Sequence, residues 1–136
     1  MTTRRHFRAA RAGQAMVEFA MVLPLLLLLL VGLIEFGRAW NLHQVVTDAS
    51  REGARNAVLP TVDEDSVKKV VKRALANAAI NPAAATIELD DTDVPGEPAT
   101  VQVELPYEFV FFGPLMGWAT GERIITLTAR STMRNE

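Results

Sequence analysis

The chain has 136 residues, 49% of them hydrophobic, a formal charge of −2 and no cysteine. This length allows one domain with a modest core, and without cysteine no disulfide can stabilise it. Residues 1–13 contain four arginines and no acidic residue, so the rest of the chain has 10 basic and 16 acidic residues and a formal charge of −6. This acidic remainder argues against nucleic acid as a partner.

Residues 1–13 are short, basic and without hydrophobic periodicity. They predict a cytoplasmic leader rather than a folded element. Residues 3–8 also resemble a twin-arginine export signal. The apolar run behind them is more hydrophobic than such signals usually carry, and no Ala-x-Ala cleavage site follows it.

Residues 14–37 predict a transmembrane helix. No polar residue interrupts the run from Phe19 to Ile34, and at about 1.5 Å per residue just over twenty apolar residues cross a hydrocarbon core of about 30 Å. The arginines precede this run, and residues 38–44 contain only one cation. The positive-inside rule therefore predicts a single pass through the cytoplasmic membrane, with the N-terminus in the cytoplasm and the rest outside. Pro24 predicts a kink within the span.

Polar and aromatic residues mark both ends of the span. An unpaired carboxylate in lipid costs a few kcal/mol, so Glu18 needs either a partner or a position in the head-group zone. Glu35 and Arg38, one turn apart, predict an ion pair at the outer interface. Trp40 predicts an aromatic anchor at the same level.

Residues 38–58 predict that the helix continues outside the membrane. Apolar and small residues recur there at spacings of three and four, and no proline lies between Leu25 and Leu59. We therefore expect one helix from about Gln14 to Val58. The predicted buried stripe consists of Leu42, Val45, Val46, Ala49, Gly53 and Ala57.

A second helix is predicted over residues 62–80. Thr61, followed three residues later by Glu64, has the pattern of a capping box at its start. An apolar stripe follows, and Asn81-Pro82 is expected to end the helix.

Three alternating segments predict β-strands at about residues 85–90, 99–110 and 122–132. Between the last two we expect a strand extension followed by a loop or a short helical turn. The predicted fold class is α+β, with a long N-terminal transmembrane helix that continues outside, a second helix and a three-stranded antiparallel sheet. Residues 38–136 would form one exterior α+β domain.

An aromatic segment lies between the second and third predicted strands. It carries more apolar surface than a small sheet needs, so it either packs into the core beneath the loop or forms a docking patch for another subunit. The residues concerned are Phe109, Phe111, Phe112 and Trp118.

The sequence contains no recognisable catalytic motif, and we predict a protein that is not an enzyme and has no cofactor, metal site or small-molecule substrate. His43 stands alone in the exterior part. Clustered carboxylates are ligands for Ca²⁺ but also ordinary turn formers, so both interpretations apply to one acidic turn. That turn contains Asp90, Asp91, Asp93 and Glu97.

The start of the span resembles the processing site of type IV-like prepilins: Gly13, four further residues, then Glu18-Phe19. Within that class the chain is similar to the TadE-like family, the pilin-like proteins of the Flp or tight-adherence pilus system. The similarity is specific over residues 11–58 and only general afterwards. It rests on the segments 13–20, 23–25, 34–38 and 49–55.

This resemblance implies a pilin-like fold and cleavage after Gly13 by a membrane prepilin peptidase. Gln14 would become the N-terminus and Glu18 the fifth residue, whose carboxylate would pair with the new ammonium group. The implied role is that of a pseudopilin or minor component in pilus assembly, in a system that serves cell adhesion. The implied partners are the peptidase, other pilin-like subunits and inner-membrane platform proteins, beside the lipid bilayer itself.

Two other functions fit the sequence less well. The chain could be an uncleaved, signal-anchored exterior binding module of the cell envelope. A small exported enzyme is the third alternative, but the sequence offers it no residues with which to do chemistry.

Overall fold

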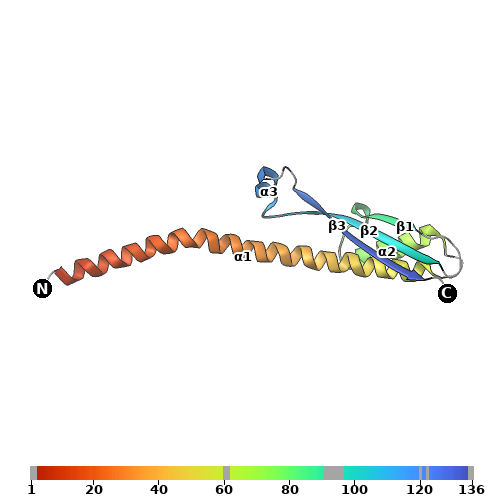
Figure 1. The fold of residues 1–136 in the computed structure, drawn as a ribbon, viewed down its shortest axis with the longest axis horizontal. Helices are drawn as coiled ribbons and strands as arrows, with labels where there is room; N and C mark the ends of the chain where they lie inside the picture. Colours follow the sequence, from red (N-terminus) through yellow and green to blue (C-terminus); the bar gives the residue numbers. More distant parts are fainter. Residues whose placement is uncertain (1–2, 60–61, 91–96, 120, 122, 135–136) are drawn as a thin grey trace.

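One long helix, α1 (Thr3–Ala57), forms the axis of the molecule (Figure 1). The computed structural model describes residues 3–59, 62–90, 97–119, 121 and 123–134. At 1.5 Å per residue, the 55 residues of α1 span about 80 Å. Figure 1 shows a bend in the N-terminal half of α1, which is the half that contains Pro24.

The continuous helix predicted over 14–58 is present, but it begins earlier than expected. Residues from Thr3 onward are helical, although the basic leader was predicted to lie outside any folded element. Alanine and arginine are among the strongest helix formers, and neither proline nor glycine precedes Gly13. Nothing in the local sequence therefore stops the helix of the span from extending into the leader.

The C-terminal third of α1 is lined with small residues where the rest of the domain packs. Val46, Ala49, Ala54 and Ala57 are buried there, as the predicted stripe implied for three of them. Gly53 marks the closest approach: a Cβ atom at this position would lie 2.6 Å from Cγ2 of Val71. The missing side chain thus allows neighbouring elements to reach the backbone of α1.

The second helix, α2 (Glu64–Asn77), is shorter at both ends than predicted. Its N-cap residue is Asp63, so the helix does not begin with the capping box that the sequence suggested, and Thr61 itself lies outside the described residues. At the other end, Ala79 adopts a positive φ of 58°. The amide of Ile80 donates to the carbonyl of Leu75, which closes the helix before Asn81-Pro82.

Asn81-Pro82 instead opens the short 3-10 helix η1 (Pro82–Ala84). The strands β1 (Thr86–Asp90), β2 (Pro98–Glu108) and β3 (Ile124–Arg134) follow as an antiparallel sheet in the order β1-β2-β3. The predicted meander is therefore confirmed. Between β2 and β3 the chain forms a short helix, α3 (Gly113–Ala119), where a loop or helical turn was expected.

The sheet buries one face and leaves the other open. Alternate residues of β2 are buried between the sheet and the helices, whereas Gln102 and Glu104 on the opposite face are only partly covered. Both α2 and the sheet contact α1, so the core forms around the C-terminal third of the long helix. Its largest fully buried hydrophobic side chains are those of Val46, Val67, Val71, Leu75, Val101 and Val103.

Candidate functional site

The N-terminal end of the apolar stretch presents the predicted processing residues on an uncovered helix. Gln14 Nε2 donates a hydrogen bond to Glu18 Oε1 at 3.0 Å, across one helical turn. Phe19 is exposed, and a Cβ atom on Gly13 would meet nothing within 4 Å. The pair Gln14–Glu18 therefore lies on one face of α1, next to a glycine that is open on all sides.

Gly13 is also the weakest helical position in this region. Glycine in a helix interior is about 1 kcal/mol less favourable than alanine. Gly13 lies within α1, so the helix is easier to unwind at this residue than it would be with alanine there.

The side chains that follow are exposed along most of the apolar stretch. Every residue from Gly13 to Leu30 is exposed, including the six consecutive leucines. By length and composition, one helix in the described part of the chain can cross a membrane, and it runs through Gly13–Ala57. An uncovered apolar surface of this length is consistent with membrane anchoring.

At the other end of the apolar stretch, Glu35 is the centre of a buried cluster. Its side chain is 2% exposed. Oε1 accepts a hydrogen bond from the Tyr107 hydroxyl at 2.6 Å and one from the Val110 amide at 3.2 Å. Oε2 accepts one from the Phe111 amide at 2.8 Å. Glu35 thus connects α1 to the end of β2 and to the loop behind it.

The ion pair predicted for Glu35 and Arg38 is present, but it is the longest contact in this cluster. Arg38 Nη1 lies 3.8 Å from Glu35 Oε1, and its side chain is half exposed. Burial, followed by the hydrogen bond to Glu35, raises the pKa of Tyr107 to about 12. The hydroxyl of Tyr107 therefore stays protonated and acts as a donor to the carboxylate.

Three aromatic rings form a row along α1, beginning next to Glu35. Phe36 and Trp40 stack with their centroids 6.1 Å apart, and Trp40 and His43 follow at 6.4 Å. Trp40 is exposed, whereas His43 is half-buried against it. An apolar groove separates this row from the loop after β2. It is lined by Gly32, Phe36, Ala39, Phe109, Phe112 and Ile125.

The aromatic segment after β2 divides into two parts. Phe109 and Phe112 are half-buried, and Phe109 meets Tyr107 edge to face at 5.3 Å. Phe111 and Trp118 are 56% and 87% exposed, so they do not belong to the core of the chain. Phe111 lies in the loop after β2 and Trp118 in α3, a helix that Figure 1 shows standing away from the sheet. Of the two interpretations of this segment, docking stays a prediction, and core packing does not apply to these two residues.

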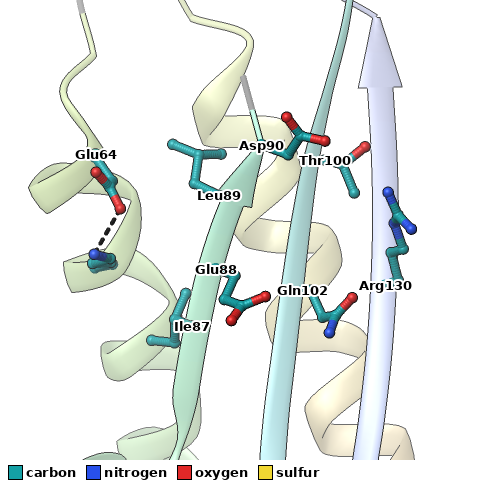
Figure 2. Close-up of a pocket in the computed structure, with 9 residues that line it drawn as sticks. Glu64, Ile87, Glu88, Leu89, Asp90, Thr100, Gln102 and Arg130 are labelled. Atoms are coloured by element: carbon teal, nitrogen blue, oxygen red, sulfur yellow. Dashed lines mark ion pairs between the residues drawn. The ribbon is translucent and has the colours of Figure 1, made fainter. Parts of the chain in front are cut away.

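The open face of the sheet is polar (Figure 2). Glu88, Gln102 and Arg130 are register partners on the three strands and lie side by side across the sheet. Beside them, Glu64 of α2 is paired with Lys68 at 2.7 Å. These residues line a shallow groove of charged and amide groups.

Metal binding finds no support in the part of the chain that the structure describes. No group of three or more His, Cys, Asp or Glu side chains is placed there to hold a metal ion. Of the acidic turn considered for Ca²⁺, Asp90 and Glu97 are described, but Asp91 and Asp93 lie outside the described residues.

The Glu35 cluster is the feature that sequence reasoning missed. A single acid at the end of an apolar run and a single tyrosine in the chain were visible signals. The contact between Glu35 and Tyr107 joins residues 72 positions apart, and no local pattern predicts such a pair. Sequence periodicity could show only the local partner, Arg38.

Comparison with known protein families supports the resemblance drawn from the sequence. Residues 13–55 match the family model described as TadE-like protein. The matched region begins at Gly13, includes Gln14, Glu18 and Glu35, and ends near the end of α1. Neither the comparison with curated proteins nor that with solved structures gives a match.

Proposed function

We propose that this protein is a pilin-like component of a Tad pilus and that a prepilin peptidase cleaves it after Gly13. The observation that carries the proposal is the TadE-like match, which begins at Gly13. The apolar stretch behind this glycine supports membrane anchoring. In this role the protein would be a pseudopilin or minor subunit with no catalysis of its own.

Glu18 would supply the register signal for assembly. Cleavage gives Gln14 a free ammonium group one helical turn from the Glu18 carboxylate, and the Gln14 side chain already bonds to it at 3.0 Å. An unpaired carboxylate in lipid costs a few kcal/mol, so a helix with such a carboxylate favours a partner that supplies a positive charge. The partner is either the new terminus of the same chain or that of a neighbouring subunit.

The processing step is tested by measuring the intact mass of the protein from native membranes, with and without the prepilin peptidase. We expect a mature form that begins at Gln14 only when the peptidase is present. Gly13→Val should keep the full chain, because a bulky β-branched residue replaces the open glycine. Gly37→Val is the matched control, since Gly37 also lies in α1 with nothing within 4 Å of a Cβ atom.

The assembly step is tested with Glu18→Ala in the same strain. We expect normal insertion and loss of co-purification with the other pilus subunits. Normal co-purification of this variant would contradict the role of Glu18. A chain that keeps its leader whether or not the peptidase is present would contradict the processing step.

A second function is favoured by one observation. Phe111 and Trp118 are exposed on the exterior part, so an uncleaved, anchored module that binds an envelope component through them is the alternative. Retention of residues 1–13 on the mature protein would favour it.

A further inference from the structure

The loop and helix between β2 and β3 form an apolar surface that the fold of this chain leaves uncovered. Residues 109–119 contain no charged side chain. Val110 and Phe111 are each more than half exposed, and Trp118 is 87% exposed. Exposure of so much apolar surface to water is unfavourable, so we expect another molecule to cover it.

The position of this segment along α1 indicates the occupant. Phe112 lies against Gly32, where a Cβ atom would be 3.6 Å from its ring. Gly32 lies five residues inside the end of the predicted span at Gly37, which corresponds to about 7.5 Å along the helix axis. Figure 1 shows α3 standing away from the sheet, toward the N-terminal half of α1. The segment is therefore at the depth where the span leaves the hydrocarbon.

Exposed apolar side chains lie on both sides of the groove between α1 and the segment. On α1 it runs through Leu33, Phe36 and Trp40, all more than half exposed. On the other side of the apolar groove, Ile124 at the start of β3 is also more than half exposed. The groove between these two sides is mostly apolar, although Glu35 and His43 are among its lining residues. Lipid around the span can therefore reach the segment along this groove.

Two backbone amides of the loop already have hydrogen-bond partners within the protein, as a lipid environment requires. An amide that is exposed to lipid needs a partner within the protein. The amides of Val110 and Phe111 both donate to the carboxylate of Glu35, at 3.2 and 2.8 Å. The charged residues that border the segment in the sequence are Glu108 before it and Glu122 and Arg123 after it. Glu108 and Arg123 are exposed.

We propose that residues 109–119 form a second membrane contact, with Phe111 and Trp118 embedded in the interfacial zone of the outer leaflet beside α1. The occupant of the apolar surface is lipid, as expected for tryptophan and phenylalanine at a membrane interface. The contact requires only a single copy of the chain, whether or not the leader has been removed, and it is independent of the proposed role in a pilus.

Tryptophan fluorescence of the full chain tests this proposal, because Trp40 and Trp118 are the only two tryptophans. The Trp40→Phe variant reports on Trp118 alone and the Trp118→Phe variant on Trp40 alone. Each is reconstituted at one copy per nanodisc, with lipids brominated on their acyl chains, so that no second subunit can cover the loop. A water-exposed control carries both substitutions and Lys72→Trp on the exposed face of α2.

We expect brominated lipid to quench Trp118 about as strongly as Trp40, and lipid to protect Trp118 from aqueous acrylamide. The Lys72→Trp control should show the reverse pattern. The proposal is overturned if Trp118 behaves like this control. It is also overturned if Trp118 is protected from acrylamide but not quenched by brominated lipid, because protein would then cover it.

Discussion

At the scale of single residues, Glu35 shows how a charged group is accommodated at the edge of an apolar stretch. A buried carboxylate is costly unless hydrogen bonds satisfy its oxygens. Here a phenol and two backbone amides supply the donors, and Arg38 adds a positive charge at the border. The sequence predicted the local pair with Arg38. The three other donors belong to residues more than seventy positions away. They reach Glu35 only because the sheet packs against α1.

Tyr107 allows this cluster to be measured directly, because it is the only tyrosine in the chain. We expect the ultraviolet absorbance of the phenolate to titrate near pH 12 in the folded chain in detergent micelles, against 10 for an ordinary tyrosine. Glu35→Gln should lower this pKa, because it removes a negative charge that opposes ionisation. Glu108→Gln, at an exposed carboxylate on the same strand, is the control and should leave it unchanged.

The raised pKa of Tyr107 also makes the free energy of unfolding depend on pH in the alkaline range. The folded state holds the proton of Tyr107 more tightly than the unfolded state, so its contribution is complete below about pH 10 and is lost as the pH rises toward 12. Tyr107→Phe should remove this dependence. A titration midpoint that Glu35→Gln does not move would contradict the contact between the two side chains.

At the scale of elements, the sequence was most informative where a pattern repeats locally. The stripe on the C-terminal third of α1 was visible from spacing alone, and Val46, Ala49, Gly53 and Ala57 are indeed buried. The ends of α2 were predicted wrongly because the strongest local signals, Thr61 and Asn81-Pro82, lie beyond them. The helix ends just before Ala79, which has a positive φ. Alanine seldom adopts this conformation, so the local sequence does not predict it.

Gly53 gives the packing of these elements a quantitative test. Gly53→Ala should lower the free energy of unfolding of the domain around the C-terminal third of α1 by about 1–3 kcal/mol, since the added methyl group would lie 2.6 Å from Val71 and 3.1 Å from Val101. Urea denaturation of the full chain in micelles, followed by circular dichroism, measures the loss. Gly37→Ala is the control, because its methyl group meets nothing within 4 Å. Equal stability of both variants would show that α1, α2 and β2 do not pack so closely.

At the scale of the whole molecule, the sequence predicted the α+β layout and the strand order, because alternation and turns fix an antiparallel meander. It could not place the loop before α3 against α1 at Gly32. Hydrophobic composition shows that a segment is stable only in an apolar environment. It does not show whether that environment is the core, another subunit or lipid. The contact of Phe112 with Gly32 joins residues eighty positions apart and follows from the length and direction of β2.

The orientation of the chain is open to a direct test because it contains no cysteine. We expect a membrane-impermeant maleimide to label Lys72→Cys in intact spheroplasts and to label Arg8→Cys only after the membrane is permeabilised. The four arginines of the leader would hold it on the cytoplasmic side. A strain without the prepilin peptidase keeps residue 8 attached during the assay. Labelling of Arg8→Cys in intact spheroplasts would reverse the proposed orientation.

Because α1 is unbroken, the domain that packs on its C-terminal third would follow any tilt of the predicted span. The helix continues from Gly37 to Ala57 without a proline or a change of element, so it has no hinge at the membrane surface. Twenty residues correspond to about 30 Å, and a tilt change of about 10° in the span would move the far end of α1 sideways by roughly 5 Å. Span tilt adjusts to bilayer thickness. A local change in thickness would therefore shift the domain relative to its neighbours, although no contact within the chain had changed.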